Sequence, residues 1–473
     1  MCITGSLKNI IPACICLSVL FMLSGCTKEK QSVPEAAPSV KKEVVALSRV
    51  LATIADNEKQ DAPPSHEYAE SSVKPSSDMI IEINKYGNGV AYIAKIGERY
   101  CVVHNGKVGK LYDSIEGYTL ILSPDGQRVA YGAKSGETSY VVVDGVEKGP
   151  FTDRGRIAFS PDSKHVGYDA KIGNNWYMYV DNIKNDGALQ YFDRSVFSHD
   201  SSKVTYLEVT DVSGVYRLIT SDLKFKQNMA LTIADTAYAV NAEKTTVAAV
   251  EKKQTKWNVV SFDYDHPDKL KTGESYDDIK QLTFSEKGKS LAYIAVKEGK
   301  SYIVLDDKEE LLPEGEYPWP FVVRPENRGV GIFIVHSKGK LTSAYLHHAF
   351  APASQQNKTY KEGAHLTYSR DGKHHAYVAI LNEKFTIVVD GKEGPFFDRV
   401  VYPHFSPDGK FLVYRARQDN RRFVVVADIN GKIIKRLPPY ERIFDTTFTE
   451  DGKSVAYGVK DGNQVAWKVE ALQ

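Results

Sequence analysis

Residues 405–414, with the sequence FSPDGKFLVY, contain the pattern that decides the fold. Pro407 presets the backbone for the first position of a turn, Asp408 can accept hydrogen bonds from nearby backbone amides, and Gly409 tolerates a positive φ. The turn leads directly into Phe411 to Tyr414, a short apolar run rich in residues that favour strands. This stretch therefore predicts a tight turn followed by a β-strand.

The same pattern recurs along the chain as an apolar residue, a turn of the Ser-Pro-Asp-Gly type, and a strand with a tyrosine nine positions after the first residue. The clear copies begin at Leu122, Phe159, Phe197, Phe284, Tyr368, Phe405 and Phe448. Degenerate copies end at Tyr92, Ala249 and Ile332, which makes ten copies spaced 37 to 45 residues apart. Short strands at this period are typical of propeller blades, so we expect an all-β fold with a β-propeller of four-stranded blades.

The repeats resemble the WD40-like repeats of TolB and of prolyl-oligopeptidase-type propellers over about residues 79–473, and we assign residues 78–473 to the propeller. The resemblance implies a fold rather than a function. Ten copies exceed the usual four to eight blades, so one large ring, two propellers and a ring with extra strands are all open. The last copy ends near Leu472 after three predicted strands, which leaves room for an N-terminal segment to supply the outer strand and close the ring.

The composition of the 473 residues is that of a globular chain, with 42% hydrophobic residues and nearly balanced charge. Lysine and arginine number 61 and aspartate and glutamate 60; without Lys8, the only charged residue among residues 1–25, the balance is 60 to 60. This balance gives no electrostatic reason to expect a nucleic acid as a partner. Cys101 is the one cysteine beyond residue 26, so we expect no internal disulfide in an exported form.

The N-terminal segment has the layout of a signal peptide. Lys8 precedes an apolar stretch from Ile10 to Leu23, which ends in the sequence Leu-Ser-Gly-Cys at residues 23–26. This ending resembles the lipobox of bacterial lipoproteins. The resemblance implies that residues 1–25 are a cleaved signal peptide, and that Cys26 carries diacylglycerol on its thiol and a further acyl chain, such as palmitate, on its amine. Several acyl chains give stable anchoring that one chain does not.

The resemblance also implies a location in the cell envelope. Thr27 follows the cysteine, where an aspartate often retains lipoproteins at the inner membrane of diderm bacteria, so the outer membrane is favoured. Residues 26–77 are assigned to the lipidated N-terminus and a polar linker rich in Lys, Glu, Ser, Pro and Ala. Within them, Val40, Val44, Leu47, Leu51 and Ile54 recur at helical spacing, which favours either a docked amphipathic helix over about 40–57 or a transient helix in the linker.

Catalytic and cofactor motifs are sparse. The sequence has no zinc-protease helix motif, no paired Cys-x-x-Cys and no nucleophile elbow, and we expect neither a cofactor nor a catalytic residue. Five histidines gather in the seventh and eighth repeats: His347, His348, His365, His374 and His375. Because adjacent strand residues point to opposite faces, we expect each pair to split, and we interpret these residues as surface or rim histidines without a metal.

A second recurring feature is an aromatic residue followed by Asp or by Asp-Arg, just before the inner strand of a blade. In a propeller this link lies on the face opposite the Ser-Pro-Asp-Gly turns, near the channel, so the charged residues are candidates for a binding rim. The alternative is that they form hydrogen bonds and salt bridges between blades. The candidate rim residues are Asp113, Asp153, Arg154, Asp193, Arg194, Asp398 and Arg399.

Three functional hypotheses follow. The leading one is a non-catalytic, membrane-anchored binding or scaffold module for protein partners in the envelope, because a propeller presents many loops on one rigid face. The second is an envelope enzyme, a lyase or a glycan-active hydrolase, with its site at the channel mouth; converging carboxylates or histidines there would favour it. The third is an accessory subunit of a secretion or surface-respiration system.

The anchor is tested by the Cys26→Ala variant, which we expect to move the protein from membranes to the soluble envelope fraction. The reason is that alanine offers no thiol for the lipid. Cell fractionation with immunoblotting measures this, with Cys16→Ala as a control that leaves the four-residue match intact. Continued membrane retention of Cys26→Ala would contradict lipidation at this residue.

Overall fold

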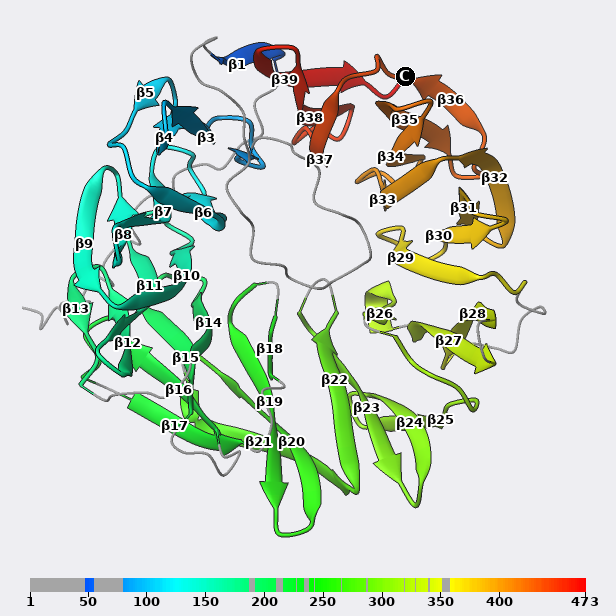
Figure 1. The fold of residues 1–473 in the computed structure, drawn as a ribbon. Coiled ribbons are helices and arrows are strands. Elements are labelled where there is room, and N and C mark those ends of the chain that lie inside the picture. Colours follow the sequence, from blue (N-terminus) through cyan, green and yellow to red (C-terminus); the bar gives the residue numbers. More distant parts are fainter. Residues whose placement is uncertain are drawn as a thin grey trace, which may run out of the picture. The chain divides into compact units, whose positions relative to one another are not determined.

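The computed structural model describes residues 47–54 and 80–473, with gaps at 187–191, 210–215, 227, 234–237, 242, 265, 286–287, 319, 328, 339–340 and 351–357. The chain divides into two compact units, residues 1–39 and 40–473, and all described residues belong to the second. This unit is a β-propeller of ten antiparallel sheets that follow one another in chain order (Figure 1). Each sheet is called a blade and numbered from 1.

The strands of each blade are given from the inner to the outer strand. Blades 1 to 5 comprise β2 (Ile81–Ile83), β3 (Val90–Ile96), β4 (Arg99–His104), β5 (Lys107–Val108); β6 (Ser114–Leu122), β7 (Val129–Ser135), β8 (Thr138–Val143), β9 (Val146–Phe151); β10 (Asp153–Phe159), β11 (Val166–Ile172), β12 (Asn175–Val180), β13 (Ile183–Lys184); β14 (Phe192–Phe197), β15 (Lys203–Val209), β16 (Tyr216–Asp222), β17 (Asn228–Ile233); and β18 (Tyr238–Val240), β19 (Thr246–Lys253), β20 (Lys256–Asp263), β21 (His266–Tyr276).

Blade 7 has three strands among the described residues, and a short 3₁₀ helix, Pro325–Asn327, occupies its first turn. Blades 6 to 10 comprise β22 (Asp278–Phe284), β23 (Leu291–Lys297), β24 (Lys300–Leu305), β25 (Lys308–Leu311); β26 (Val322–Val323), β27 (Val330–Lys338), β28 (Leu341–Ala349); β29 (Glu362–Tyr368), β30 (His375–Leu381), β31 (Lys384–Val389), β32 (Lys392–Phe397); β33 (Arg399–Phe405), β34 (Phe411–Gln418), β35 (Arg421–Asp428), β36 (Ile433–Arg436); and β37 (Arg442–Phe448), β38 (Ser454–Asp461), β39 (Gln464–Ala471), β1 (Arg49–Thr53).

The outer strand of blade 10 comes from the N-terminal side of the chain, as the three-stranded final repeat predicted. β1 pairs antiparallel with β39, from Arg49 opposite Trp467 to Thr53 opposite Gln464. The helical spacing over 40–57 was therefore misleading at residues 49–53, which form a strand; residues 40–46 and 55–57 lie outside the described part. The physical reason is the open edge of β39, whose unpaired backbone groups bind a strand, whereas a short helix must nucleate without such help.

The repeated turn is held by a serine and an aspartate rather than by proline. In blade 9, Ser406 Oγ donates to Asp408 Oδ1 at 2.6 Å, and Asp408 Oδ1 accepts the amide of Lys410 at 3.1 Å. Ser406 Oγ also accepts the amide of Phe411 at 3.0 Å, which starts the next strand. The same side-chain pair recurs in six turns: Ser123–Asp125, Ser160–Asp162, Ser198–Asp200, Ser369–Asp371, Ser406–Asp408 and Thr449–Asp451.

The hydrophobic core is divided among the blade interfaces. Ten apolar clusters of buried residues occur, and each draws its members from two neighbouring blades. One of them joins Val465 and Ile54 of blade 10 to Ile81 and Tyr92 of blade 1. The ten blades therefore close into a single ring, and the alternatives of two propellers or extra strands do not hold.

Ring closure also depends on a close approach at Gly87. Its φ is +73°, and a Cβ there would lie 2.3 Å from Cε2 of Trp467. Its carbonyl accepts a hydrogen bond from Arg49 Nη2 at 2.7 Å, so β1 is fastened to blade 1 as well as to blade 10. Only glycine fits both the backbone conformation and the space.

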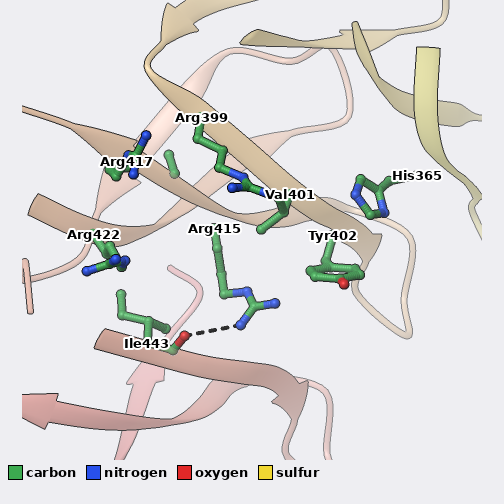
Figure 2. Close-up of a pocket in the computed structure, with 9 residues that line it drawn as sticks. His365, Arg399, Val401, Tyr402, Arg415, Arg417, Arg422 and Ile443 are labelled. Carbon is green, nitrogen blue, oxygen red and sulfur yellow. Dashed lines mark hydrogen bonds between the residues drawn. The ribbon is translucent and has the colours of Figure 1, made fainter. Parts of the chain in front are cut away.

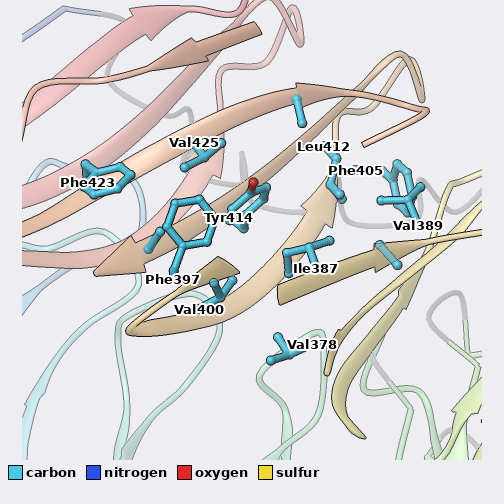
Figure 3. Close-up of a cluster of buried hydrophobic side chains, with 13 residues drawn as sticks. Val378, Ile387, Val389, Phe397, Val400, Phe405, Leu412, Tyr414, Phe423 and Val425 are labelled. Atoms are coloured by element: carbon cyan, nitrogen blue, oxygen red, sulfur yellow. The ribbon is translucent and has the colours of Figure 1, made fainter. Parts of the chain in front are cut away.

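An aromatic pair recurs at the interfaces. The aromatic residue of a link packs against the tyrosine that ends the repeat pattern in the next blade, with ring centroids 6.0 to 6.2 Å apart. The pairs are Tyr112–Tyr131, Phe151–Tyr168, Tyr276–Tyr293, Tyr360–Tyr377 and Phe397–Tyr414. Figure 3 shows the last pair within the cluster between blades 8 and 9, with Phe423 beside it.

The importance of this pair is tested by Phe397→Ala. Phe397 is 1% exposed, so truncation removes buried area and leaves a cavity; we expect the free energy of unfolding to fall by about 3–5 kcal/mol. Urea unfolding followed by tryptophan fluorescence measures the change. The neighbouring Phe396 is 45% exposed and is the matched control, because Phe396→Ala should cost less than ~1 kcal/mol. Equal losses in the two variants would contradict the interface role.

Candidate functional site

The links and the repeated turns lie on opposite faces, as expected. A link is the segment that connects the outer strand of one blade to the inner strand of the next. Each inner strand begins at a link and ends at a repeated turn, so the link and the repeated turn lie at opposite ends of the blade. Because the strands are antiparallel, the hairpin turn between the second and third strands lies at the same end as the link. We call the face with the links the link face and the other the turn face. The candidate rim residues of the sequence therefore belong to the link face.

Asp113 and Asp398 each hold a turn on the link face. Asp113 Oδ2 accepts the amide of Gly136 at 2.7 Å, and Asp398 Oδ2 accepts that of Asp419 at 2.9 Å. Thr152 and Asp277 bind the turns of their own blades in the same way, at 3.0 and 2.7 Å. Lys384 Nζ also lies 2.7 Å from Asp398 Oδ1 and lowers the pKa of that carboxyl. The acidic residue of the link thus stabilises its own blade.

Arg154 is a buried bridge between blades 2 and 3. Its side chain is fully buried, Nη1 lies 2.6 Å from Glu116 Oε2, and Nε donates to the carbonyl of Tyr140 at 3.0 Å. Burial alone would raise the pKa of Glu116, but Arg154 holds it below its ordinary value. Asp153 accepts the amide of Arg154 at 2.9 Å. Arg154 therefore serves the fold by the blade-to-blade bonding that was the alternative to a rim, whereas the contact of Asp153 stays within β10.

Two other predicted positions are described only in part, and one not at all. Asp193 and Arg194 lie in β14, where Asp193 pairs with Leu207, but their side chains are outside the described structure. Cys26 lies outside the described residues. Its lipidation stays a prediction.

Arg399, one of the candidate rim residues, lines a cavity. This cavity has a volume of about 270 Å³ and is formed by blades 8, 9 and 10 at the link face. We call it the arginine cavity, because Arg399, Arg415, Arg417 and Arg422 line it together with His365 and Tyr402. Figure 2 shows Arg417 and Arg422 on one side, His365 and Tyr402 on the other, and Arg415 between them.

Three of these arginines form a row across blade 9. Arg399 of β33 is the direct cross-strand partner of Arg417 in β34, and Arg417 is the direct partner of Arg422 in β35. We call this row the arginine ladder. Direct partners on antiparallel strands have Cβ atoms roughly 4.5–5.5 Å apart, so like charges there destabilise the sheet. Within the described part of the chain, none of the three forms an ion pair with a carboxylate, and Arg422 donates instead to the carbonyl of Glu441.

Arg415 occupies the floor of the cavity and is held in place. Its Nη2 lies 3.0 Å from Asp445 Oδ1, its Nη1 donates to the carbonyl of Ile443 at 3.1 Å, and its guanidinium lies over the Tyr402 ring at 4.8 Å. Its Nε is buried without a hydrogen-bond partner. Burial lowers the pKa of Arg415, and Asp445 opposes that shift.

Bulges in the inner strands carry His365 and Tyr402 into this region. Both residues have positive φ, +53° and +52°, and each sits where the register shifts between an inner strand and the next strand. A bulge re-aims side chains, which here places the two rings 4.5 Å apart beside the arginines. Burial lowers the pKa of His365, and the charges of Arg399 and Arg415 lower it further, which favours the neutral imidazole. The cavity's positive charge therefore comes from arginine.

A second cavity of about 270 Å³ adjoins the first through Arg415 and Ile443. It is lined by residues of blades 10 and 1, among them Glu82, Arg442 and Asp445. Burial by the surrounding protein and the charge of Asp445 raise the pKa of Glu82 to about 7, against the opposing effect of Arg442. The sequence pointed to none of these residues.

The histidines differ from their expected arrangement in one respect. His374 and His375 do not split, because His374 ends the turn before β30 and strand alternation does not apply to it. His374 Nδ1 lies 2.7 Å from Asp390 Oδ2, and His375 Nδ1 lies 3.2 Å from Asp390 Oδ1. Among the described residues no group of three or more His, Cys, Asp or Glu side chains could hold a metal ion. No helix in this part of the chain is long and apolar enough to cross a membrane.

The sequence pointed to Arg399 as a rim residue and to His365 as a surface or rim histidine, but not to the other residues of the cavity. The signal that could have found Arg415 and Arg417 is their spacing of two on a predicted strand, which places both on one face. Arg422 follows the next hairpin turn, so folding the predicted hairpin would have paired it with Arg417. Tyr402 and His365 carried no such signal, since a bulge inside a strand is not visible in the repeat pattern.

No protein-family model and no curated protein sequence matches the chain. Solved structures similar to it include a eukaryotic initiation factor, at 14% identity, 76% coverage of this chain and 97% of that chain, with a TM-score of 0.43. TolB from Acinetobacter baumannii is similar at 15% identity over 61% of this chain and 79% of its own, with a TM-score of 0.27. An oligogalacturonate lyase in complex with manganese is similar at 14% identity, 69% and 98% coverage, and a TM-score of 0.32. At these values the similarity extends to the propeller fold alone.

The raised pKa of Glu82 predicts how stability depends on pH. The unfolded chain releases this proton near pH 4.5 and the folded chain near 7, so the folded state binds more protons between these values and stability falls as pH rises through them. We expect Glu82→Gln to unfold at higher urea concentration than the parent at pH 8 and at the same concentration below pH 4.5. An equal difference at both pH values would contradict the assignment.

Proposed function

We propose that this chain is a lipid-anchored, non-catalytic binding protein of the cell envelope, and that its propeller binds a protein partner at the arginine cavity. The observation that carries the proposal is the arginine ladder, in which three cationic side chains lie side by side without a carboxylate partner among the described residues. Such an arrangement costs the isolated fold free energy. A partner that brings negative charge would recover it.

The closed ring suits a binding role. Ten apolar clusters fix the position of each blade against its neighbours, so the cavity walls from blades 8, 9 and 10 are held by both faces of blade 9. A preformed site loses little conformational entropy on binding.

The envelope location rests on the match of residues 23–26 to a lipobox and on the polar composition of the residues that follow. The ring-closing strand β1 lies between Cys26 and the rest of the propeller in sequence. Residues 27–48 would thus connect an anchor at Cys26 to the strand that completes blade 10. Thr27 in place of aspartate supports the outer membrane as the site of attachment.

A second candidate function is an envelope enzyme, favoured by the second cavity. Glu82, with a pKa near 7, faces Asp445 and Arg442 there, and a carboxyl group with such a pKa can act as a general base or acid at neutral pH. Lyase or glycan hydrolase activity in the parent that is lost in Glu82→Gln would support this alternative. Unchanged partner binding in the same variant would favour the binding role.

The binding role is tested by affinity purification from envelope fractions with the anchor retained. We expect specific proteins to be recovered with the parent chain and lost with the double variant Arg399→Ala/Arg417→Ala, because the cavity loses half of its arginines. Quantitative mass spectrometry measures the recovery.

The matched control is Lys410→Ala/Lys432→Ala, which removes the same charge from exposed positions on the turn face of the same blade. Its recovered proteins should equal those of the parent. Equal recovery with the parent, the double arginine variant and the double lysine variant would contradict the assignment of the arginine cavity as the binding site.

A further inference from the structure

We infer that the arginine ladder binds an acidic segment of a partner polypeptide, through neighbouring Asp or Glu carboxylates seated against Arg399, Arg417 and Arg422. The inference rests on the proposed function and names the chemistry that the partner must bring. It follows from the register of three strands, the contacts of the neighbouring carboxylates Asp398 and Asp445, and the kind of donors that line the cavity.

The register places more positive charge in the cavity than the chain neutralises. Direct pairing of Arg399 with Arg417 and of Arg417 with Arg422 sets three guanidinium groups on one face of blade 9. Strands lie roughly 4.8 Å apart, so the row extends over about 10 Å. Asp398, which precedes β33, is bound to Lys384 and to the amide of Asp419, and the charge of Arg417 also lowers the pKa of its carboxyl without an ion pair between the two. A ligand with a single negative charge would leave part of the row unneutralised.

The protein's own Asp445 shows how a carboxylate is held here. Asp445 is 91% exposed at its side chain, yet Oδ1 lies 3.0 Å from Nη2 of Arg415. An exposed, rotatable carboxylate is thus paired with the one arginine of the cavity that lies outside the ladder. The ladder offers guanidinium groups of the same kind to the carboxylates of a partner.

The donors of the cavity favour carboxylate over phosphate. The cavity walls are sheet strands, the N–H of Arg422 donates to the carbonyl of Tyr440 at 3.3 Å, and no described helix begins at the site. Phosphate sites commonly add backbone amides to surround a tetrahedral group. Guanidinium groups alone present planar pairs of donors, which match the planar carboxylate.

The occupant is a polypeptide segment because of the cavity's size and position. About 270 Å³ accommodates one or two acidic side chains rather than a folded surface. The Tyr402 ring lies beside Arg415 at 4.8 Å and His365 at 4.5 Å, so part of its surface is already in contact with the protein. An extended acidic segment can place alternate side chains into the cavity.

The test measures the fluorescence anisotropy of a fluorescein-labelled hexaglutamate peptide as the full-length protein is added. A labelled hexaglutamine peptide of the same length is measured in the same way. We expect saturable binding of hexaglutamate that weakens as salt is raised, and none of hexaglutamine. Arg399→Ala/Arg417→Ala should weaken binding at least ~10-fold, since a hydrogen bond to a charged group contributes about 1.5–3 kcal/mol. Lys410→Ala/Lys432→Ala should bind as the parent does.

Two further variants separate recognition from net charge and from folding. Arg399→Lys/Arg417→Lys keeps the charge and loses the planar donor pairs, so it should bind nearly as weakly as the alanine variant; full binding by the lysine variant overturns the inference. Arg417→Ala should unfold at the same or higher urea concentration than the parent, because it relieves two like-charge contacts. Clear destabilisation would mean that the ladder serves the fold, and would also overturn the inference.

The competing ligands give the remaining outcomes. Inorganic phosphate at 1,000-fold excess over ~1 µM peptide should not displace hexaglutamate, and phosphatidylglycerol vesicles should not bind through these arginines. Displacement by phosphate, or vesicle binding lost in Arg399→Ala/Arg417→Ala, would overturn the acidic-peptide assignment. If purification recovers arginine-dependent partners while hexaglutamate fails to bind, this inference fails and the proposed function stands; if neither occurs, both fail.

Discussion

The structure depends on the burial of apolar surface between blades. A four-stranded sheet of this length has two apolar faces and cannot cover either one by itself, so each blade is stable only between two neighbours. The recurring aromatic pair, such as Phe397 against Tyr414, lies at the centre of this contact and joins the end of one blade to the second strand of the next. Because the apolar faces of the first and last blades must also be buried, the row of blades has to close into a ring. β1 supplies the last strand and Gly87 the space for Trp467, and both belong to that closure.

This constraint also decides what the charged residues near the links can do. Arg154 fills the space above Gly132, where a Cβ would lie 2.2 Å from its Nε, and binds Glu116 of the neighbouring blade. Asp113 and Asp398 are committed to turn amides. Charged groups used in this way stabilise the ring, and their contacts within the protein compete with any contact to a ligand. Blade 9 differs because Arg417 lies opposite Arg399, and Arg422 lies opposite Arg417 on the next strand. Positive charge therefore accumulates there and is not paired with carboxylates.

Sequence reasoning reached far into the fold and less far into the site. The period of the Ser-Pro-Asp-Gly turns predicted ten blades, and the incomplete final repeat indicated a strand contributed from the N-terminal side. The apolar spacing of Leu47, Leu51 and Ile54 favoured a helix instead, because periodicity does not register the free edge of β39 that captures residues 49–53. In the same way the link pattern pointed to Arg399, which lines the arginine cavity. It could not separate Arg399 from Arg154, since the difference lies in what faces each side chain from another blade.

The sequence alone therefore determined the local elements, their number, the polarity of the ring with links on one face and turns on the other, and the expectation of a lipid anchor at Cys26. These follow from short-range chemistry: turn residues, strand alternation and a contiguous signal of four residues. The tertiary structure decided that the ring is single, which strand closes it, and which arginines meet. Those outcomes depend on register between strands and on contacts between residues such as Glu82 and Asp445, which are hundreds of positions apart in the chain and adjacent only when the tenth blade packs against the first.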